Sequence, residues 1–459
     1  MAELQKRVNP SGKSRIIFAF FLFSIIVVSA ILPYPEKDSI LKYTGSFIIV
    51  SSSYLVLYLF LYHFRSEVLM VIRKTLFIIM IILIFLILTK IIVASPYQNL
   101  LYLVPFAVIP IMIRTFYDAR LALFTLLITL MLAGLIVPDP FRFVFMNFIS
   151  GMVAIFSMVN IYRKARLLFI ALMVFISYSA LYTGTGLMID GSFKNVLLIQ
   201  IIVFAVNSVL LLVSYPVIFY FEKEFLFLSD ATLLELADTN QPLLRKLADE
   251  APGSFQHSLQ VSNLAEEAAR IIGANLLLVR TGALYHDIGK IADPEYFTEN
   301  QSDGISPHEN MDPAESAKVI INHVKNGVVL AKNYKLPVQI IDFIRMHHGT
   351  TTAYYFLKKY SDMHPGITGM EKEFTYPGPR PFSKETAVVM MADAVEASSR
   401  SLGKYTEEAI SEMVERVLYL QENAGQFSEV PLTFKDISDI KAAFKKRLAN
   451  MHHVRIAYP

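Results

Sequence analysis

Histidine and aspartate stand side by side at His286 and Asp287, in the segment Tyr285–Lys290 (YHDIGK). An imidazole and a carboxylate at adjacent positions suit a site with two metal ions, because the carboxylate can bridge both cations while the imidazole binds one. Further residues of these types follow in the same half of the chain, and nine of the ten histidines lie after residue 256. The candidate metal ligands are His257, His286, Asp287, His323, His347, His348 and Asp393.

The residue types in this set indicate which metals and which reaction to expect. A single histidine on an apolar helix is more often a core residue than a ligand, but Asp393 has apolar neighbours on both sides. A buried carboxylate needs a cation or hydrogen bonds. Imidazoles with carboxylates suit Mn, Fe or Zn better than Ca or Mg. Two such ions could activate a bridging hydroxide for phosphoryl displacement. The pattern therefore predicts a metal-dependent phosphohydrolase without naming its substrate.

The composition excludes several other kinds of chemistry and partner. The chain has no cysteine, which excludes disulfides, thiolate nucleophiles and cysteine-ligated zinc or iron–sulfur sites. The net charge of +3 is modest, and the lysines and arginines between the hydrophobic segments account for it. We therefore expect no nucleic-acid polymer as a partner.

The first half of the chain has the composition of a membrane domain. Hydrophobic residues make up 54% of the sequence, too many for an ordinary soluble enzyme. Before about residue 222 they form runs close to the ~20 residues that cross a bilayer. We predict eight spans in the lipid bilayer, one followed by seven. Their ranges are 15–33, 45–63, 72–94, 99–115, 119–137, 141–162, 166–187 and 195–221.

Positive charge in the short loops predicts the orientation of these spans, because lysine and arginine accumulate on the cytoplasmic side. One side carries Lys6, Arg7, Lys13, Arg15, Arg65, Arg73, Lys74, Arg114, Arg120, Arg163, Lys164, Arg166 and Lys223. The other side carries only Lys37, Lys42, Lys90, Arg142 and Lys194. We therefore expect a multi-pass protein of the cell membrane with both termini in the cytoplasm.

The composition becomes that of a soluble, helical protein after residue 222. We predict a membrane domain over 1–222, a helical linker over 223–240 and a soluble domain over 241–459. Apolar residues at helical spacing predict soluble helices over 276–285, 314–323, 338–348 and 387–397. No run of alternating strands is evident, so both domains are expected to be all-α.

The C-terminal half resembles the HD-domain phosphohydrolases, whose ligand pattern is H…HD…H…HH…D. Within that superfamily the chain is similar to the seven-transmembrane-HD proteins, the PgpH-type cyclic di-AMP phosphodiesterases. The segments that carry this resemblance are APGSFQHSLQVSNLAEEAA, GALYHDIGKIADPEYFTENQ, HHGTTTAYYF, YPGPRPFSKE and RIAYP. The membrane region is similar in its arrangement. Family members usually have a large extracellular domain after the first span, whereas here only Pro33–Tyr43 fills that place.

The resemblance implies a ligand assignment and a reaction. His257, His286 and Asp393 would hold one metal, His323, His347 and His348 the other, and Asp287 would bridge. The two metals would be divalent transition-metal ions, Mn or Fe. The implied reaction is hydrolysis of cyclic di-AMP to linear pApA by a metal-bridging hydroxide. Lys290 could act in catalysis by neutralising a phosphate oxygen, or could be a solvated lysine at a helix end. His308 and Tyr355 are candidates for contacts with the substrate.

Two other functions stay open from the sequence. The first is an HD phosphohydrolase for another nucleotide, such as cyclic di-GMP or a guanosine phosphate. Cyclic di-GMP enzymes usually show a GYP-type signature, whereas Gly349-Thr350 follows the histidine pair here. The second is a receptor or transporter with an inactive HD domain, against which the complete ligand set argues. A homodimer is also left open.

Overall fold

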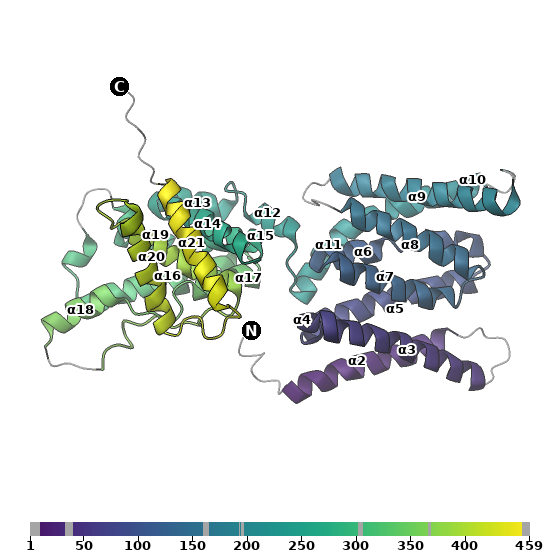
Figure 1. Cartoon of the computed structure of the whole chain (residues 1–459), viewed down its shortest axis with the longest axis horizontal. Coiled ribbons are helices and arrows are strands. Elements are labelled where there is room, and N and C mark those ends of the chain that lie inside the picture. The colour runs from purple at the N-terminus through teal and green to yellow at the C-terminus, as the bar shows by residue number, and fades with distance from the viewer. Residues whose placement is uncertain are drawn as a thin grey trace, which may run out of the picture. The chain divides into compact units, whose positions relative to one another are not determined.

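The computed structural model describes residues 10–32, 40–158, 165–191, 193, 197–301, 306–365 and 369–451. The chain divides into two compact units, Met1–Ser229 and Asp230–Pro459, and this division falls inside the segment 223–240. Both units are helical (Figure 1), and the described ranges contain no strand beyond the isolated bridge between Thr352 and Thr375. The predicted all-α fold class is therefore confirmed.

Part of the predicted topology concerns residues that the structure does not describe. The segment 33–39 between the first two spans lies outside the described residues, as do Lys6, Arg7, Lys37, Arg163, Lys164 and Lys194, and the side chains of Lys13 and Arg166. The predicted orientation of the termini therefore stays a prediction.

The first unit contains an apolar helical segment at each of the eight predicted spans. Six are long and apolar enough to cross a membrane, namely Ile40–Phe64, Ile72–Ala94, Gln98–Phe116, Pro140–Ser157, Leu167–Ile189 and Leu198–Phe225. Arg15–Ile31 and Ala119–Gly134 are shorter apolar helices. The chain is thus a multi-pass membrane protein, with six helices of sufficient length among the described residues.

The helices of the first unit are in most cases separated from the next helix by only a few residues of sequence (Figure 1). They are α2 (Pro10–Ile31), α3 (Ile40–Phe64), α4 (Ser66–Leu69), α5 (Ile72–Ala94), η1 (Gln98–Leu103), α6 (Val108–Phe116), α7 (Ala119–Gly134), α8 (Pro140–Ser157), α9 (Ala165–Asp190), α10 (Leu198–Leu210), η3 (Leu211–Val213) and α11 (Ser214–Phe225). Consecutive helices pack against each other, as α7 does on α6 and α8.

One predicted span is broken into two parts, η1 and α6. Pro105 causes the break, because proline lacks an N–H and favours an extended conformation at the residue before it. Asn207 of α10 compensates, since its Nδ2 donates to the carbonyl oxygens of Tyr102 and Val104 at 2.7 and 3.2 Å. In a bilayer such released carbonyls must find a partner within the protein. The buried asparagine therefore stabilises a discontinuous span.

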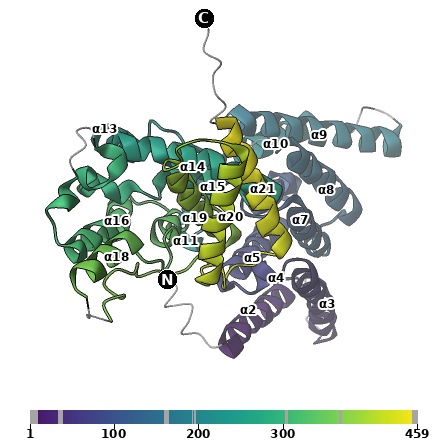
Figure 2. The ribbon, with the colours of Figure 1, turned by 60° about the vertical axis from the view of Figure 1, so that its left-hand side comes forward.

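The second unit builds its core around α14 (Pro252–Ile271), which packs against α15 (Leu276–Tyr285), α19 (Lys384–Ser399) and α21 (Phe434–Met451). Figure 2 shows α19, α20 and α21 gathered beside α14 and α15. The other helices are α12 (Asp230–Leu236), α13 (Pro242–Glu250), η4 (Ile288–Ala292), η5 (Pro294–Tyr296), η6 (Thr298–Asn300), η7 (Pro307–Glu309), α16 (Pro313–Asn333), α17 (Val338–Met346), α18 (Tyr354–Met363) and α20 (Glu407–Asn423).

Three of the four predicted soluble helices differ from the observed ones in their ends. The helix over 276–285 has the predicted bounds, and the helix predicted over 314–323 continues to Asn333. The helix over 338–348 ends at Met346, before the histidine pair, and Gly349 follows in a left-handed conformation with φ of +51°. The helix over 387–397 begins earlier, at Lys384, because Ser383 and Thr386 form a capping box.

Backbone segments approach each other closely where η4 meets α16. A Cβ atom at Gly289 would overlap the carbonyl oxygen of His323, and it would lie 2.5 Å from the backbone nitrogen of Gly327. Only glycine permits this approach, because both obstacles are backbone atoms. The glycine of the YHDIGK segment therefore sets the distance between Asp287 and His323.

Candidate metal centre

Five segments of the second unit deliver the predicted ligands to one place. His257 lies in α14, His286 and Asp287 follow α15, His323 lies in α16, His347 and His348 follow α17, and Asp393 lies in α19. Six of the seven residues are buried, and His348 is partly exposed. Three overlapping groups of these side chains place their ligand atoms within 4.8 Å of one another. Residues separated by up to 136 positions thus converge on one cluster.

Asp287 lies between the two groups of histidines. Its Oδ2 atom is 3.5 Å from His257 Nε2 and 3.2 Å from His286 Nε2. Its Oδ1 atom is 3.3 Å from His323 Nε2 and 3.5 Å from His347 Nε2. Each carboxylate oxygen therefore faces a different pair of imidazoles, which is the arrangement that a bridging carboxylate needs.

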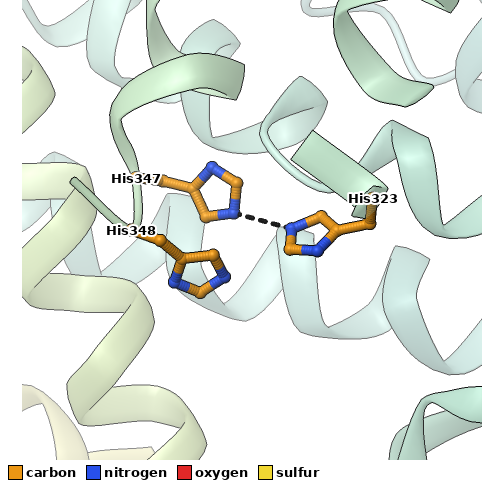
Figure 3. A group of neighbouring side chains, drawn as sticks. All are labelled: His323, His347 and His348. Carbon is orange, nitrogen blue, oxygen red and sulfur yellow. Dashed lines mark hydrogen bonds between the residues drawn. The ribbon is translucent and has the colours of Figure 1, made fainter. Parts of the chain in front are cut away.

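His323, His347 and His348 form the histidine-only group, and their rings face a common space (Figure 3). The Nε2 atoms of His323 and His347 are 3.1 Å apart. The Nδ1 atoms of these two rings face the carbonyl oxygens of Ile320 and Ile344, at 2.5 and 3.0 Å. Because Nδ1 must carry the proton to donate to a carbonyl, both Nε2 atoms are left with lone pairs that suit a cation.

His257, His286 and Asp393 form the second group. His257 Nε2 lies 2.9 Å from Asp393 Oδ1, and His286 Nε2 lies 3.6 Å from the same oxygen. The other oxygen of Asp393 is 3.8 Å from His348 Nδ1. A third group, which joins His286 and Asp287 to His347, overlaps the other two. The two halves of the cluster are therefore continuous.

Two buried polar atoms in this cluster have no hydrogen-bond partner among the described residues, His286 Nε2 and Asp287 Oδ1. A buried polar atom without a partner is costly in free energy, and both atoms are of the types that ligate transition metals. The cluster and the donor set therefore fit divalent metal ions.

The charges in the cluster differ between its two halves. Burial alone would lower the pKa of His286, but the carboxylates of Asp287 and Asp393 outweigh it and raise that pKa to about 10. Burial lowers the pKa of His347, and burial together with the neighbouring His347 holds the pKa of His348 well below its ordinary value. The lowered pKa values favour the neutral form of His347 and His348, which is the form that binds metal.

Lys290 is buried in an ion-pair network beside this cluster. Its Nζ atom is 2.8 Å from Asp287 Oδ2 and 2.7 Å from Glu299 Oε1, and its side chain is only 12% exposed. Burial would lower the pKa of Lys290, but these two carboxylates raise it well above its ordinary value. The interpretation of Lys290 as a solvated lysine is therefore wrong, because its charge is held against Asp287 inside the domain.

A cavity of about 650 Å³ opens beside the cluster. It is lined by His257, His347, His348 and Asp393, by Lys290 and Glu299, and by residues of α19 and α20 as far as Arg400 and Gln421. The volume lies within the range of about 300–1,000 Å³ typical of small-molecule sites. A ligand in this cavity would therefore contact the proposed metal ligands at one end.

The other two predicted substrate contacts do not line this cavity. His308 is buried, its Nε2 is 2.9 Å from the carbonyl oxygen of Tyr296, and its ring packs against Tyr296 and Phe356. Tyr355 is 70% exposed at the start of α18. Tyr376 lies closer to the cluster, since it is buried with its ring centroid 4.3 Å from that of His348. Tyr376 therefore forms part of the wall around the histidine pair.

Two acidic residues of the site were not predicted from the sequence, Glu299 and Glu396. Glu299 pairs with Lys290, and Glu396 accepts a hydrogen bond from His257 Nδ1. Glu396 follows Asp393 by three positions on an apolar helix, a spacing that places both carboxylates on one face. That spacing was the available signal for Glu396, whereas nothing in the sequence links Glu299 to Lys290.

Comparisons with known proteins agree with this architecture. The family described as "7TM receptor with intracellular HD hydrolase" matches residues 40–229, and the HD domain family matches residues 254–398. A protein of Bacillus subtilis (strain 168) named cyclic-di-AMP phosphodiesterase PgpH is 35% identical over 374 residues, which cover 79% of this chain and 52% of that protein. The protein of the same name from Listeria monocytogenes (strain 10403S) is 41% identical over 239 residues, which cover 52% of this chain and 33% of that one.

A crystal structure of the L. monocytogenes PgpH HD domain in complex with cyclic-di-AMP is 40% identical to this chain. The match covers 47% of this chain and 100% of that one, with a TM-score of 0.45. The chain spans about half the length of the B. subtilis relative and a third of the L. monocytogenes relative.

A polytopic helical membrane unit followed by an all-helical unit with the H…HD…H…HH…D residues defines a membrane protein with an HD domain. The chain belongs to the family of seven-transmembrane proteins with an intracellular HD hydrolase domain. The resemblance inferred from the sequence motifs is confirmed.

Proposed function

We propose that this protein is a membrane-anchored phosphodiesterase with two metal ions that hydrolyses cyclic di-AMP to linear pApA. The observation that carries the proposal is the position of Asp287, whose two oxygens face different groups of buried histidines. The relatives named cyclic-di-AMP phosphodiesterase are 35% and 41% identical over 374 and 239 residues. The cavity beside the cluster supplies room for a nucleotide.

The proposed ligand assignment follows the two groups in the structure. One cation is held by His257, His286 and Asp393, the other by His323, His347 and His348, and Asp287 bridges them. When bound, the two cations would activate water and offset charge on the attacking and leaving oxygens of a phosphoryl displacement. Mn or Fe suits this set of imidazoles and carboxylates.

The residues around the cations have proposed roles of their own. Asp287 fixes the separation of the two groups, and Lys290, which lines the cavity, offsets negative charge of a phosphate oxygen while remaining paired with Glu299. The buried wall at Tyr376 limits solvent beside His348. No side-chain nucleophile is needed, in keeping with the absence of cysteine.

The substrate assignment is tested with the full chain in detergent, incubated with Mn²⁺ and a panel of nucleotides. We expect hydrolysis of cyclic di-AMP to pApA at a higher kcat/KM than for cyclic di-GMP or guanosine phosphates, measured by chromatography of the products. Removal of the metal with a chelator should abolish the reaction, and adding Mn²⁺ back should restore it. Preference for a guanine nucleotide would contradict the substrate, and inertness toward every member would favour a receptor with an inactive HD domain.

We also propose that both termini are cytoplasmic, because lysine and arginine are more frequent in the loops on that side of the predicted spans. A reporter fused after Pro459 should behave as a cytoplasmic protein, and a second reporter placed after Lys223 should give the same result. A reporter after Asp139, before α8, serves as the control and should lie on the opposite side. External activity at Pro459 would contradict both the orientation and a cytoplasmic substrate. A homodimer stays a prediction.

A further inference from the structure

Glu396 is a buried carboxylate of the second unit that the proposed ligand set does not use. It is 1% exposed and lies on α19, three residues after Asp393. A buried carboxylate is costly unless charged or polar partners surround it. Glu396 has two such partners, His257 through Oε2 and Arg400 through Oε1.

The contact with Glu396 determines which nitrogen of His257 faces the other candidate metal ligands. Nδ1 of His257 bonds Glu396 Oε2, so Nε2 is directed toward Asp393 and Asp287, at 2.9 and 3.5 Å. With its proton on Nδ1, the ring donates to this carboxylate oxygen of Glu396. This leaves the lone pair of Nε2 for a cation.

His257 differs in this respect from the other buried histidines of the cluster. The Nδ1 atoms of His286, His323 and His347 face the backbone carbonyl oxygens of Ala283, Ile320 and Ile344. A hydrogen bond to a carboxylate is stronger than one to a carbonyl and makes the ring a better metal ligand. His257 is thus the buried imidazole whose orientation depends on another side chain.

Arg400 holds Glu396 in place. Arg400 directly follows α19, four residues after Glu396, and its Nε and one terminal nitrogen donate to Glu396 Oε1 at 2.9 and 2.8 Å. Two donors on one oxygen restrict the carboxylate more than one would, and they leave Oε2 for His257. Arg400 is itself 39% exposed and lines the cavity.

We propose that Glu396 is a positioning residue which, held by Arg400, orients His257 and thereby sets the affinity of the His257–His286–Asp393 group for a divalent metal ion. This inference rests on the metal centre of the proposed function. It concerns one of the two metal positions and leaves the His323–His347–His348 group unaffected.

The test is a titration of the metal-free full chain in detergent with Mn²⁺, followed by calorimetry and by electron paramagnetic resonance. The wild-type chain should bind two ions and show the spectrum of a coupled pair. Glu396→Gln keeps the shape of the side chain but removes its charge, and should weaken one of the two binding steps by about 10- to 100-fold. The other step should keep its affinity, so that at low Mn²⁺ the spectrum becomes that of a single ion.

Two further variants complete the design. Arg400→Met keeps most of the stem while releasing Glu396, and should weaken the same step by a smaller factor. Glu415→Gln is the matched control, because Glu415 of α20 also pairs with two cations, Lys441 and Lys445, but lies outside the cluster. It should leave both steps unchanged.

Three results would overturn the inference, and a fourth would instead contradict the proposed function. Two unchanged binding steps in Glu396→Gln would overturn it, and so would equal weakening of both steps with a lower melting temperature, which indicates a general structural role. If Glu396→Gln does not fold, Arg400→Met decides, and unchanged binding there overturns the inference. A wild-type chain that binds no Mn²⁺ contradicts the proposed function itself, a result distinct from two-ion binding that ignores Glu396.

Discussion

We expect Asp287→Ala to lower the turnover of cyclic di-AMP by several orders of magnitude and to leave fewer than two metal ions per chain. The variant removes an oxygen from each of the two histidine groups, since Oδ1 and Oδ2 face different imidazoles. Phosphoryl displacement between two cations requires both of them. Asp287→Asn should fail almost as badly, because it keeps the shape of the side chain but loses the charge.

The matched comparison is His323→Ala, which removes a ligand from one group only. This variant should keep one metal ion and part of its affinity for the substrate. Elemental analysis and turnover measured on the same purified samples separate the two cases. Asp287→Ala with two ions and normal turnover would show that the buried histidines are only a structural core.

Gly289→Ala should destabilise the second unit by about 3 kcal/mol or more, at the upper end for an overpacked position. The added Cβ overlaps the carbonyl oxygen of His323 and approaches the backbone of Gly327. Neither obstacle is a flexible side chain, so η4 and α16 must move apart. Because Asp287 precedes η4 and His323 lies in α16, these two proposed metal ligands should separate as well, and turnover should fall with stability.

Gly403→Ala provides the control for this substitution. Gly403 has no neighbouring atom within 4 Å of the position that a Cβ would occupy, and its φ is not positive. The stability of the Gly403→Ala variant should be unchanged or slightly raised. Hydrogen exchange followed by mass spectrometry on the full chain localises the effect, with faster exchange in η4 and α16 expected for Gly289→Ala alone. Identical exchange in both variants would show that the two backbones are not in contact.

Both the fold class and the convergence of the candidate ligands could be predicted from the sequence. The reason differs between the two. Membrane helices are visible because the bilayer demands long apolar runs, and each of the eight predicted runs coincides with an apolar helical segment, one of them broken at Pro105. The candidate ligands could be named because nine of the ten histidines lie in one half of the chain. The roles of these residues at the metal stay predictions until metal content is measured.

Other features depend on contacts between distant residues and could not be predicted. Asn207 compensates for the break before Pro105 from a helix about a hundred residues away. Two interpretations of Lys290 stayed open from the sequence, a catalytic lysine and a solvated one. Its partner Glu299 becomes evident only when η6 folds beside it. Predicted helix ends were wrong where a cap decided them, as at Ser383.

The long separation between His257 and Asp393 has a consequence for the order of events while the protein is being made. These two side chains are 136 positions apart and lie 2.9 Å from each other in the folded unit. At ~5–20 residues per second, a ribosome needs roughly 7–27 s to travel from one to the other. Throughout that interval the growing chain carries His257 and His286 without Asp393, so loading of the metal position proposed for these three residues would have to wait for α19 to emerge. The membrane-inserted part would therefore be made well before the chain could hold both of the proposed ions.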